Sequence, residues 1–405
     1  MSQWRHNAKC LVCSSGDMVI VFDLGSQPLA NNLASEPFDH TTAEYPLALS
    51  QCQQCRHLQL AQTVDPKWLY CCDYKFRSSI SDTFRQSCEV LVDTFSDIRP
   101  TDTWLDIGCN DGTLLKVVRN THRCEVIGID PAESVTHAMI DGIPIIQDFF
   151  SSALLDKLQD RPCAKVISAQ NVLAHQIDLH DFLSAVALLL DKDGTFVFDV
   201  PWALNLFNDR QFDMVYHEHV NYMLMKPLER LLNQHGLYIY HIEEIESHGG
   251  SLRVFTWKNR DIMGAADSYI DDESASGVYT LQGWAQFQGD CHKFREDFSK
   301  YLTTLPGRIC GLGAPAKATV LINYCQIDSR LVEYIVDDTK EKAGHYIPGS
   351  DIPVCNRECA SRRKKAEHAV IFAWNWASEI KRKFPGYNYI IPRVKRVTSE
   401  DYVSV

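Results

Sequence analysis

The sequence lacks any apolar run that approaches the roughly 18 residues needed to span a bilayer. Its opening residues, MSQWRHNAKC, do not contain the apolar segment of a secretory signal. Excess positive charge is also missing: the formal net charge is −12, whereas a nucleic-acid-binding surface needs a clustered basic face. We therefore expect a soluble, cytoplasmic protein that binds neither a membrane nor a nucleic acid.

Cysteine, by contrast, is plentiful, with 15 residues that are odd in number and scattered along the chain. In a long chain without a secretory signal, this pattern favours reduced thiols and a metal site over a disulfide scaffold. Two CxxC pairs stand out, Cys10 with Cys13 and Cys52 with Cys55. Four thiolates suit the tetrahedral coordination of a structural zinc ion and leave no ligand position for water. The alternative interpretation is four unrelated buried cysteines, and the nearby His57 is expected to lie at the surface.

A length of 405 residues suggests two or three domains. The second segment of the chain contains a glycine-rich turn. The segment TWLDIGCNDGTLLKVV, from Thr103, combines a short apolar strand, a turn and a helix. Such a unit brings the backbone close to a ligand at the helix N-terminus, and an acid about 20 residues later can accept hydrogen bonds from ribose hydroxyls. The unit therefore predicts binding of a dinucleotide or of S-adenosylmethionine (SAM). The candidate cofactor contacts are Asp106, Gly108, Asn110, Gly112 and Asp130.

Three details favour SAM over a dinucleotide. The turn begins D-x-G rather than G-x-G, as in class I methyltransferases. A third strand, IPIIQDFF, ends in Asp148 and Phe149, which can contact adenine, although a surface acid and a core aromatic are the alternatives. A fourth strand ends near Gln170 and Asn171, with His175 in the loop or helix beyond. Because an open α/β sheet binds ligands at the carboxyl ends of its strands, we expect these residues to meet there.

The fifth predicted strand spans residues 195–199, and a cluster of titratable residues follows it at 213–222. In a class I methyltransferase, substrate-facing residues gather at this position. The two histidines are spaced i, i+2 and lack the H-E-x-x-H pattern of a helical zinc site, so we interpret the cluster as substrate-facing. The stretch DMVYHEHVNY contains Tyr216, His217, Glu218, His219 and Tyr222.

The third segment of the chain contains another nucleotide-like turn. The run RICGLGAPAKATVLINYC fits G-x-G-x-x-A and is followed about 20 residues later by Asp337, so a dinucleotide site is one interpretation. A second is the diphosphate of a nucleotide sugar, with Lys317 as a point charge, and a third is a plain turn with a surface lysine. The candidate substrate contacts along the chain are Asn171, Tyr222, Gly313, Lys317 and Tyr346.

Taken together, these motifs resemble the SAM-dependent sugar C-methyltransferases that act on nucleotide-linked ketodeoxysugars. The resemblance covers essentially the whole chain and includes the paired CxxC, LGSQPLANN, LDIGCNDG, NVLAH, YHEH, HGGSLRV and GLGAPAKATVLINY. It implies an α/β protein with three domains: a small zinc-binding domain at 1–66, a class I SAM-methyltransferase core with a Rossmann-like fold at 67–262, and a second Rossmann-like domain at 263–405. Asp338 and Thr339 depart from the family, whose members more often have Asn-Pro there, which affects only the local turn shape.

The resemblance also implies the reaction, which is methyl transfer from SAM to C-3 of a 4-keto-6-deoxyhexose carried by a nucleoside diphosphate such as dTDP or GDP. It assigns His175, Tyr216, Glu218 and His219 to the active site. Tyr74 is a further candidate for closing over SAM. The enzyme is expected to act as a monomer in the biosynthesis of a branched deoxysugar.

The predicted chemistry starts with removal of a proton, because a carbon atom is a poor nucleophile until it loses one. His219 is the preferred base, since an unperturbed histidine pKa of about 6.5 leaves the ring largely neutral at pH 7. Tyr216 is better suited to donate to the enolate oxygen, a role that His175 could share, and Glu218 to hold a sugar hydroxyl or orient His219. An O- or N-methyltransferase is the alternative, because it would use the same SAM site without a base for a C–H bond.

Overall fold

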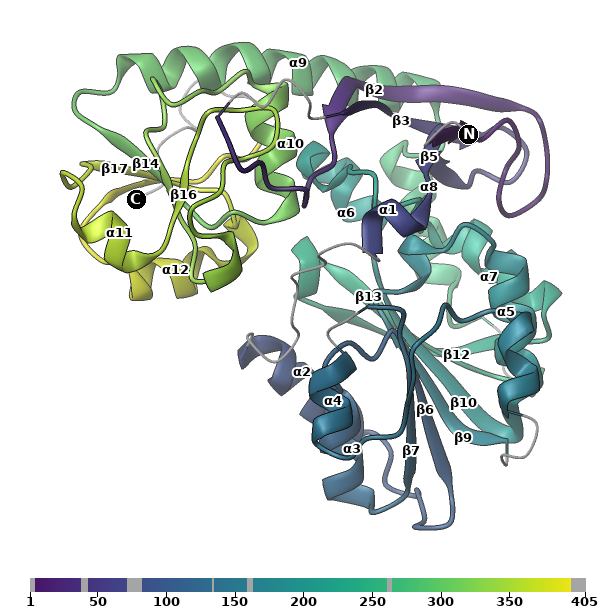
Figure 1. The fold of residues 1–405 in the computed structure, drawn as a ribbon. Helices are drawn as coiled ribbons and strands as arrows, with labels where there is room; N and C mark the ends of the chain where they lie inside the picture. Colours follow the sequence, from purple (N-terminus) through teal and green to yellow (C-terminus); the bar gives the residue numbers. More distant parts are fainter. Residues whose placement is uncertain are drawn as a thin grey trace.

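The computed structural model describes residues 4–37, 43–70, 82–132, 135–158, 163–260 and 264–394. These residues form an N-terminal, a central and a C-terminal part, each built around its own sheet (Figure 1). Residues 213–222 of the central part contact both of the others, through a strand pairing on one side and a side-chain hydrogen bond on the other. This segment contains the cluster of titratable residues, so the fold places that cluster at the junction of the three parts.

The N-terminal part is a four-stranded antiparallel sheet in the order β11-β4-β3-β2. Its edge strand, β11, comes from the central part of the chain and pairs with β4. A second, two-stranded sheet joins β1 to β5. The elements are β1 (Trp4–His6), β2 (Met18–Pro28), β3 (Glu44–Cys52), β4 (Leu58–Leu60), β5 (Gln62–Val64), α1 (Pro66–Tyr70) and β11 (Asn221–Tyr222).

The central part is a seven-stranded sheet in the order β12-β13-β10-β9-β6-β7-β8. β13 runs antiparallel to both of its neighbours, and the remaining neighbouring pairs are parallel. This is the strand order of a class I SAM-methyltransferase core, and the fold predicted from the sequence is confirmed. The strands are β6 (Thr103–Ile107), β7 (Glu125–Ile129), β8 (Ile145–Ile146), β9 (Ala164–Gln170), β10 (Leu190–Pro201), β12 (Tyr238–Ile245) and β13 (Ser251–Trp257).

The central strands are mostly apolar because both faces of a parallel sheet are covered. All five residues of β6 are buried, and its polar atoms find partners inside the sheet. Trp104 Nε1 donates to Ser168 Oγ at 2.9 Å, and this hydroxyl donates to Asp106 Oδ1 at 2.6 Å. The helices of this part are α2 (Asp82–Asp93), α3 (Thr113–His122), α4 (Val135–Ile140), α5 (Leu179–Leu189), α6 (Ala203–Asn208) and α7 (Met225–Gln234).

The C-terminal part is a five-stranded, all-parallel sheet in the order β16-β15-β14-β17-β18. Numbered from β14, this is the 3-2-1-4-5 order of one Rossmann-like half. The elements are β14 (Ile309–Leu312), α10 (Ala316–Tyr324), β15 (Ile335–Val336), β16 (Val354–Cys355), α11 (Arg357–Ser361), β17 (His368–Ile371), α12 (Ala377–Lys383) and β18 (Asn388–Ile390).

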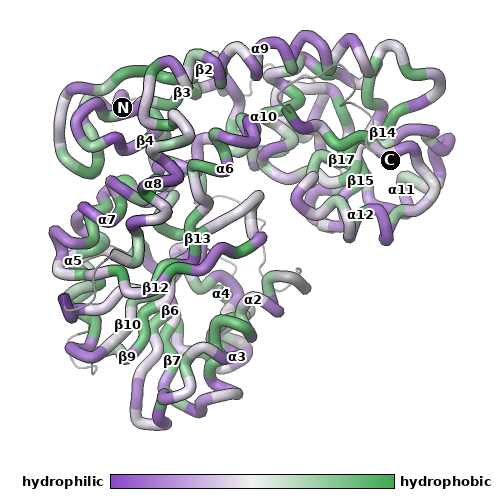
Figure 2. Tube along the Cα trace, turned by 180° about the vertical axis from the view of Figure 1, so that it is seen from behind, coloured by the Kyte–Doolittle hydropathy of each residue, from purple (hydrophilic) through white to green (hydrophobic). Residues whose placement is uncertain are grey.

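Two helices connect the central and C-terminal parts, α8 (Asp267–Ser276) and the 24-residue α9 (Leu281–Thr304). α9 runs along both the C-terminal part and β2 (Figure 1), and its hydrophilic and hydrophobic residues alternate along the helix (Figure 2). Its buried residues recur every three or four positions, which defines one apolar face. None of the helices in the described ranges is both long and apolar enough to cross a membrane. The buried face of α9 is formed by Trp284, Phe287, Cys291, Phe294, Phe298 and Leu302.

Candidate active site and metal centre

The four cysteines of the two CxxC pairs lie together in the N-terminal part. Their sulfur atoms are all within 4.8 Å of one another, with Cys10 and Cys55 at 3.5 Å and Cys13 and Cys52 also at 3.5 Å. The residue after each pair, Ser14 or Arg56, has a positive φ, and a backbone N–H approaches a sulfur within each pair at 3.4 Å. Four thiolates at this spacing suit one tetrahedral zinc ion, and no ligand position remains for water.

The catalytic candidates lie on a segment that hydrogen bonds to the zinc-binding sheet. Leu60 N donates to Val220 O at 2.9 Å, directly beside the pairing of β11 with β4. Asn221 Nδ2 donates to Gln176 O at 2.6 Å, which turns its Oδ1 toward His57 Nε2 at 3.0 Å. His57 is only 1% exposed, so the expectation that it lies at the surface was wrong. Residues 221–222 of this segment therefore pair into the sheet whose strand β3 ends at Cys52.

Tyr216 and His219 form a hydrogen-bonded pair at the start of this segment. The Tyr216 hydroxyl lies 2.8 Å from His219 Nε2, and the two ring centroids are 4.1 Å apart. The His175 ring lies on the other side, with its centroid 5.0 Å from that of His219. Two of the groups predicted to move or hold protons are thus hydrogen-bonded to each other.

His175 has a defined tautomer. Its Nδ1 lies 2.6 Å from the backbone oxygen of Glu218, and because a carbonyl oxygen can only accept, Nδ1 carries the hydrogen. Burial lowers the pKa of His175, which favours the neutral ring. Nε2 is then an acceptor. A donor role toward an enolate oxygen would require protonation of His175, which its burial opposes.

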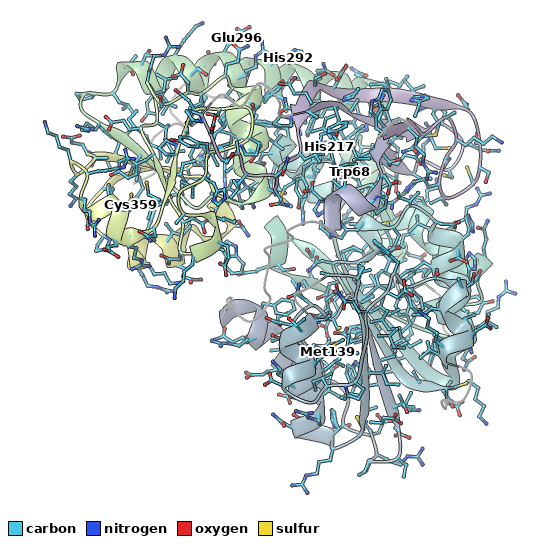
Figure 3. All side chains as sticks on the ribbon, in the orientation of Figure 1. Trp68, Met139, His217, His292, Glu296 and Cys359 are labelled. Carbon is cyan, nitrogen blue, oxygen red and sulfur yellow. The ribbon has the colours of Figure 1, made fainter. Side chains whose placement is uncertain are left out.

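Glu218 and His217 lie in different surroundings. The Glu218 side chain is 3% exposed, and its Oε1 accepts a hydrogen bond from Asn31 Nδ2 at 2.9 Å. Burial raises the pKa of Glu218, while the Asn31 amide lowers it. His217, labelled in Figure 3, donates from Nε2 to Tyr45 O at 3.3 Å, and burial lowers its pKa to about 4. His217 therefore joins the segment to β3 as a neutral ring.

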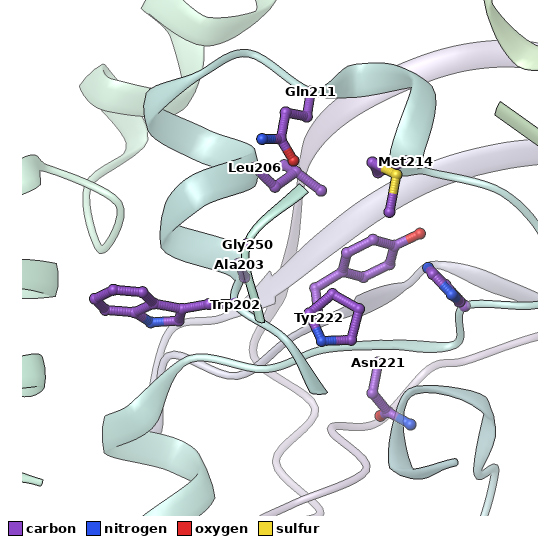
Figure 4. Close-up of a pocket in the computed structure, with 10 residues that line it drawn as sticks. Trp202, Ala203, Leu206, Gln211, Met214, Asn221, Tyr222 and Gly250 are labelled. Atoms are coloured by element: carbon purple, nitrogen blue, oxygen red, sulfur yellow. The ribbon is translucent and has the colours of Figure 1, made fainter. Parts of the chain in front are cut away.

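A small cavity is lined by His219 and by other residues of the central part. Figure 4 shows Trp202, Met214 and Tyr222 among the side chains around it. Its volume is about 10 Å³, room for roughly one water molecule. It is therefore a small packing defect beside residues 213–222 and is too small to hold a sugar. Its lining includes Trp202, Met214, His219, Asn221, Tyr222 and Gly250.

The glycine-rich turn after β6 has the backbone conformation that its sequence predicts. Gly108 has φ +72°, and a Cβ there would lie 2.4 Å from Val172 Cγ2, so this position excludes any side chain. Gly112 has φ +73° at the start of α3. Asn110, between them, donates from its backbone N to Asp130 Oδ2 at 2.9 Å. The turn and the acid at the end of β7 therefore form one unit.

The two candidate acids of this region, Asp130 and Asp106, have different hydrogen-bond partners. Asp130 Oδ1 also accepts from Ala132 N at 2.8 Å, and its carboxylate retains lone pairs for ribose hydroxyls at the strand end. Burial raises the pKa of Asp130, against the effect of the two N–H groups. Asp106 is fully enclosed and bonded to Ser168, and burial raises its pKa to about 7. Asp106 is thus held inside the sheet by Ser168 of β9.

Two buried polar atoms at the end of β9 have no hydrogen-bond partner among the described residues. They are Gln170 Nε2 and Asn171 Oδ1. Asn171 has φ +57°, in the left-handed region, which places its side chain at the edge where β6, β7 and β9 end. Because buried polar groups in native proteins are nearly always paired, these two atoms are candidates to bind a polar ligand such as SAM.

The predicted adenine contacts occupy a more exposed place than the other cofactor candidates. β8 contains only two residues and ends before them, so the third strand is shorter than the sequence predicts. Asp148 forms a partly exposed ion pair with Lys157 at 2.7 Å, and Phe149 is 38% exposed. Tyr74 lies outside the described residues. Phe149 is thus available to cover a ligand face, whereas Asp148 already has a partner.

We expect Asp130→Asn to raise the Kd for SAM by about 10- to 100-fold, since hydrogen bonds to a charged group contribute about 1.5–3 kcal/mol. Asp148→Asn, in an exposed ion pair, should change the Kd by less than about fivefold. Isothermal titration calorimetry of both variants with SAM checks this ranking. Equal losses in the two variants would contradict it.

The glycine turn of the C-terminal part is closed by its own acid. Ala314 N donates to Asp337 Oδ2 at 2.7 Å, and Thr339 N donates to Oδ1 at 2.9 Å. Lys342 Nζ donates to Ala314 O at 2.8 Å. Gly313 has φ +81°, and a Cβ at this position would lie 2.7 Å from the Cβ of Ala373. Asp337 therefore holds this turn through two backbone N–H groups, as Asp130 holds the turn of the central part.

Lys317 is enclosed where the central and C-terminal parts meet. Its Nζ donates to Asn375 Oδ1 at 2.7 Å and lies 3.9 Å from the centroid of the Trp374 ring. Trp374 Nε1 in turn donates to Asp213 Oδ2 at 2.6 Å, across the two parts. Gly249 of the HGG motif packs on Trp374, where a Cβ would lie 2.7 Å from the ring. Burial lowers the pKa of Lys317 to about 8, so it is not the surface lysine of one interpretation.

Sequence reasoning missed three side chains that shape this region: Asn31, Asp213 and Trp374. Asn31 lies in LGSQPLANN, a motif whose residues indicate no role by themselves. Asp213 and Trp374 join segments 161 residues apart, and neither has a local pattern that reveals its partner. Tyr346, a predicted substrate contact, exchanges backbone hydrogen bonds with Ala34 of the N-terminal part at 2.8 and 3.0 Å.

Family models match three consecutive stretches of the chain. Residues 10–70 match the family described as "Putative zinc binding domain", residues 80–242 a "Methyltransferase domain", and residues 246–389 a "C-methyltransferase C-terminal domain". A C-methyltransferase from Streptomyces niveus, NovU, is 27% identical over 384 residues, which cover 92% of this chain and 91% of that protein.

Solved structures resemble parts of the chain at low sequence identity. Geranyl diphosphate C-methyltransferase from Streptomyces coelicolor A3(2) is 15% identical, with a TM-score of 0.37, over 43% of this chain and 79% of that one. A SAM-dependent methyltransferase from Clostridium acetobutylicum is 14% identical, with a TM-score of 0.36, over 46% and 94% of the respective chains.

The sheet order, the glycine-rich turn bonded to Asp130, the four clustered cysteines and the matched domains define a SAM-dependent methyltransferase with a structural zinc site. The zinc-binding, methyltransferase and C-methyltransferase C-terminal domains follow one another along the chain in the same order as the motifs. The three matched domains and the similarity to NovU support the C-methyltransferase family that the motifs predicted.

Proposed function

We propose that the enzyme transfers the methyl group of SAM to C-3 of a nucleoside-diphosphate-linked 4-keto-6-deoxyhexose. The Tyr216–His219 pair, at 2.8 Å, is the observation that carries this proposal. Transfer to oxygen or nitrogen requires no strong base, whereas transfer to carbon requires removal of a C–H proton and stabilisation of the resulting enolate. A histidine and a tyrosine that share a proton can perform both tasks.

The proposed chemistry divides the work between the two side chains. His219 takes the C-3 proton, which the neighbouring C-4 ketone acidifies, at Nδ1, because Nε2 faces Tyr216. In the arrangement where His219 Nε2–H donates to Tyr216, the tyrosine hydroxyl is oriented to donate to the enolate oxygen. Neutral His175 accepts rather than donates, which suits a sugar hydroxyl. SAM supplies an electrophilic methyl group together with its own leaving group, and the protein contributes geometry and charge placement.

We propose that the nucleotide portion binds between the methyltransferase core and the C-terminal part. Lys317 and Arg393 both approach the Trp374 ring, at 3.9 and 5.2 Å from its centroid. Two cations beside an aromatic ring suit a diphosphate with an adjoining base.

Incubation with SAM and a panel of dTDP- and GDP-linked 4-keto-6-deoxyhexoses tests the reaction, with mass spectrometry and NMR of the product. We expect a mass increase of one methyl group and a new C–CH3 signal at C-3. The matching 4-hydroxy sugars, which cannot form an enolate, serve as the control and should remain unchanged. An O-methyl or N-methyl product would favour the alternative small-molecule methyltransferase.

We further propose that the protein works in the cytoplasm as a monomer. A zinc site of four thiolates needs reducing surroundings, and the cytoplasm provides them.

A further inference from the structure

Asn31 connects the N-terminal part to the catalytic segment through one side-chain hydrogen bond. Its Nδ2 donates to Glu218 Oε1 at 2.9 Å across 187 residues of sequence. Asn31 is exposed, whereas Glu218 is 3% exposed. A surface amide therefore reaches a buried carboxylate that lies directly beside His219 in the chain.

The loop that carries Asn31 is fixed by the C-terminal part. Ala30 O accepts a hydrogen bond from Thr319 Oγ1 on α10 at 2.8 Å. Three residues after Asn31, Ala34 exchanges two backbone hydrogen bonds with Tyr346. The backbone on both sides of Asn31 is thus held, which gives its short side chain a defined position relative to Glu218.

Glu218 also contacts the histidines of the site through its backbone. Its backbone oxygen accepts from His175 Nδ1 at 2.6 Å, and the His175 ring packs on His219 with centroids 5.0 Å apart. A continuous series of contacts therefore runs from Asn31 through Glu218 and His175 to His219. A change in the Glu218 side chain would alter both the charge and the geometry at the reacting pair.

We propose that Asn31 is a positioning residue for methyl transfer, which fixes the orientation and the charge of the Glu218 carboxylate; this role rests on the proposed function. The amide N–H stabilises the carboxylate against the cost of its burial. Through this bond, the N-terminal part contributes to the chemistry as well as to folding. The titratable groups around Glu218 are His175, Tyr216, His219 and Tyr222.

The test uses Asn31→Ala and Asn31→Asp in the zinc-loaded, full-length enzyme, with Asn32→Ala, at the exposed neighbouring position, as the matched control. We expect kcat to fall about tenfold or more in Asn31→Ala, with SAM Kd changed less than twofold. In Asn31→Asp the loss should shrink at low pH, because the introduced carboxyl group can donate to Glu218 when it is protonated and repels Glu218 when it is ionised. Asn32→Ala should retain wild-type kcat. Equal losses for Asn31→Ala and Asn32→Ala, or a pH-independent loss in Asn31→Asp, would overturn the role.

A measurement without substrate separates this inference from the proposed function. The titration of Glu218 is followed by NMR of protein labelled with 13Cδ-glutamate, with Glu218→Gln to assign the signal. We expect the Glu218 titration to move to higher pH in Asn31→Ala and to stay in place in Asn32→Ala. An unchanged titration overturns the role of Asn31 whatever the substrate. A wild-type enzyme that methylates no ketosugar overturns the proposed function alone.

Discussion

Replacing His219 by asparagine is expected to lower kcat for methyl transfer by about 10²- to 10⁴-fold, the usual contribution of a positioned general base. SAM binding should be unchanged. The cofactor candidates Asp130 and Asn171 follow β7 and β9, whereas His219 lies beyond the end of β10. Single-turnover kinetics and calorimetry with SAM measure the two quantities. Loss of SAM affinity in the variant would mean that His219 belongs to the cofactor site instead.

Tyr216→Phe separates the two candidate bases within the hydrogen-bonded pair. If His219 is the base, the phenylalanine variant should still exchange the C-3 hydrogen of the ketosugar for deuterium in the absence of SAM, at a reduced rate. His219→Asn should exchange none. The reverse pattern would assign the proton transfer to Tyr216 and leave His219 as its partner. Exchange in both variants would place the base elsewhere.

Loss of zinc is expected to abolish methyl transfer and to destabilise the enzyme. The Cys52→Ser variant removes one of four ligands and should release the ion, which is worth about 10–16 kcal/mol of apparent binding free energy in isolated zinc fingers. The catalytic segment should be affected because β11 is the edge strand of the zinc-binding sheet and His57 holds Asn221. The SAM site lies on the seven-stranded sheet and should keep most of its affinity.

Three measurements on Cys52→Ser test this expectation. Zinc content by plasma mass spectrometry should fall, amide hydrogen exchange in residues 213–222 should rise, and SAM should still bind by calorimetry. Cys359→Ser, at an exposed cysteine outside the cluster, is the matched control and should change none of them. Full activity in zinc-free protein would show that the sheet holds its shape without the metal.

Local patterns sufficed for the class of this enzyme. The two CxxC pairs, the D-x-G turn and the strand ends are short stretches whose spacing reflects metal coordination or the geometry of a strand–turn–helix unit. The structure brings the four sulfur atoms within 4.8 Å of one another and joins the turn to Asp130. The third strand was predicted less well, because its apolar run continues beyond the two residues that pair with β7.

The sequence by itself thus determined the metal ligands, the cofactor turn and the order of the domains, because each is marked by short motifs whose own residues lie close together along the chain. Only the tertiary structure decided which proton donors and acceptors meet. The tautomer of His175, the bond between Asn31 and Glu218, and the bond between Asp213 and Trp374 all join residues 43 to 187 positions apart. Contacts at such separations leave no periodic signal, since each partner is fixed by the packing of a whole sheet or helix around it.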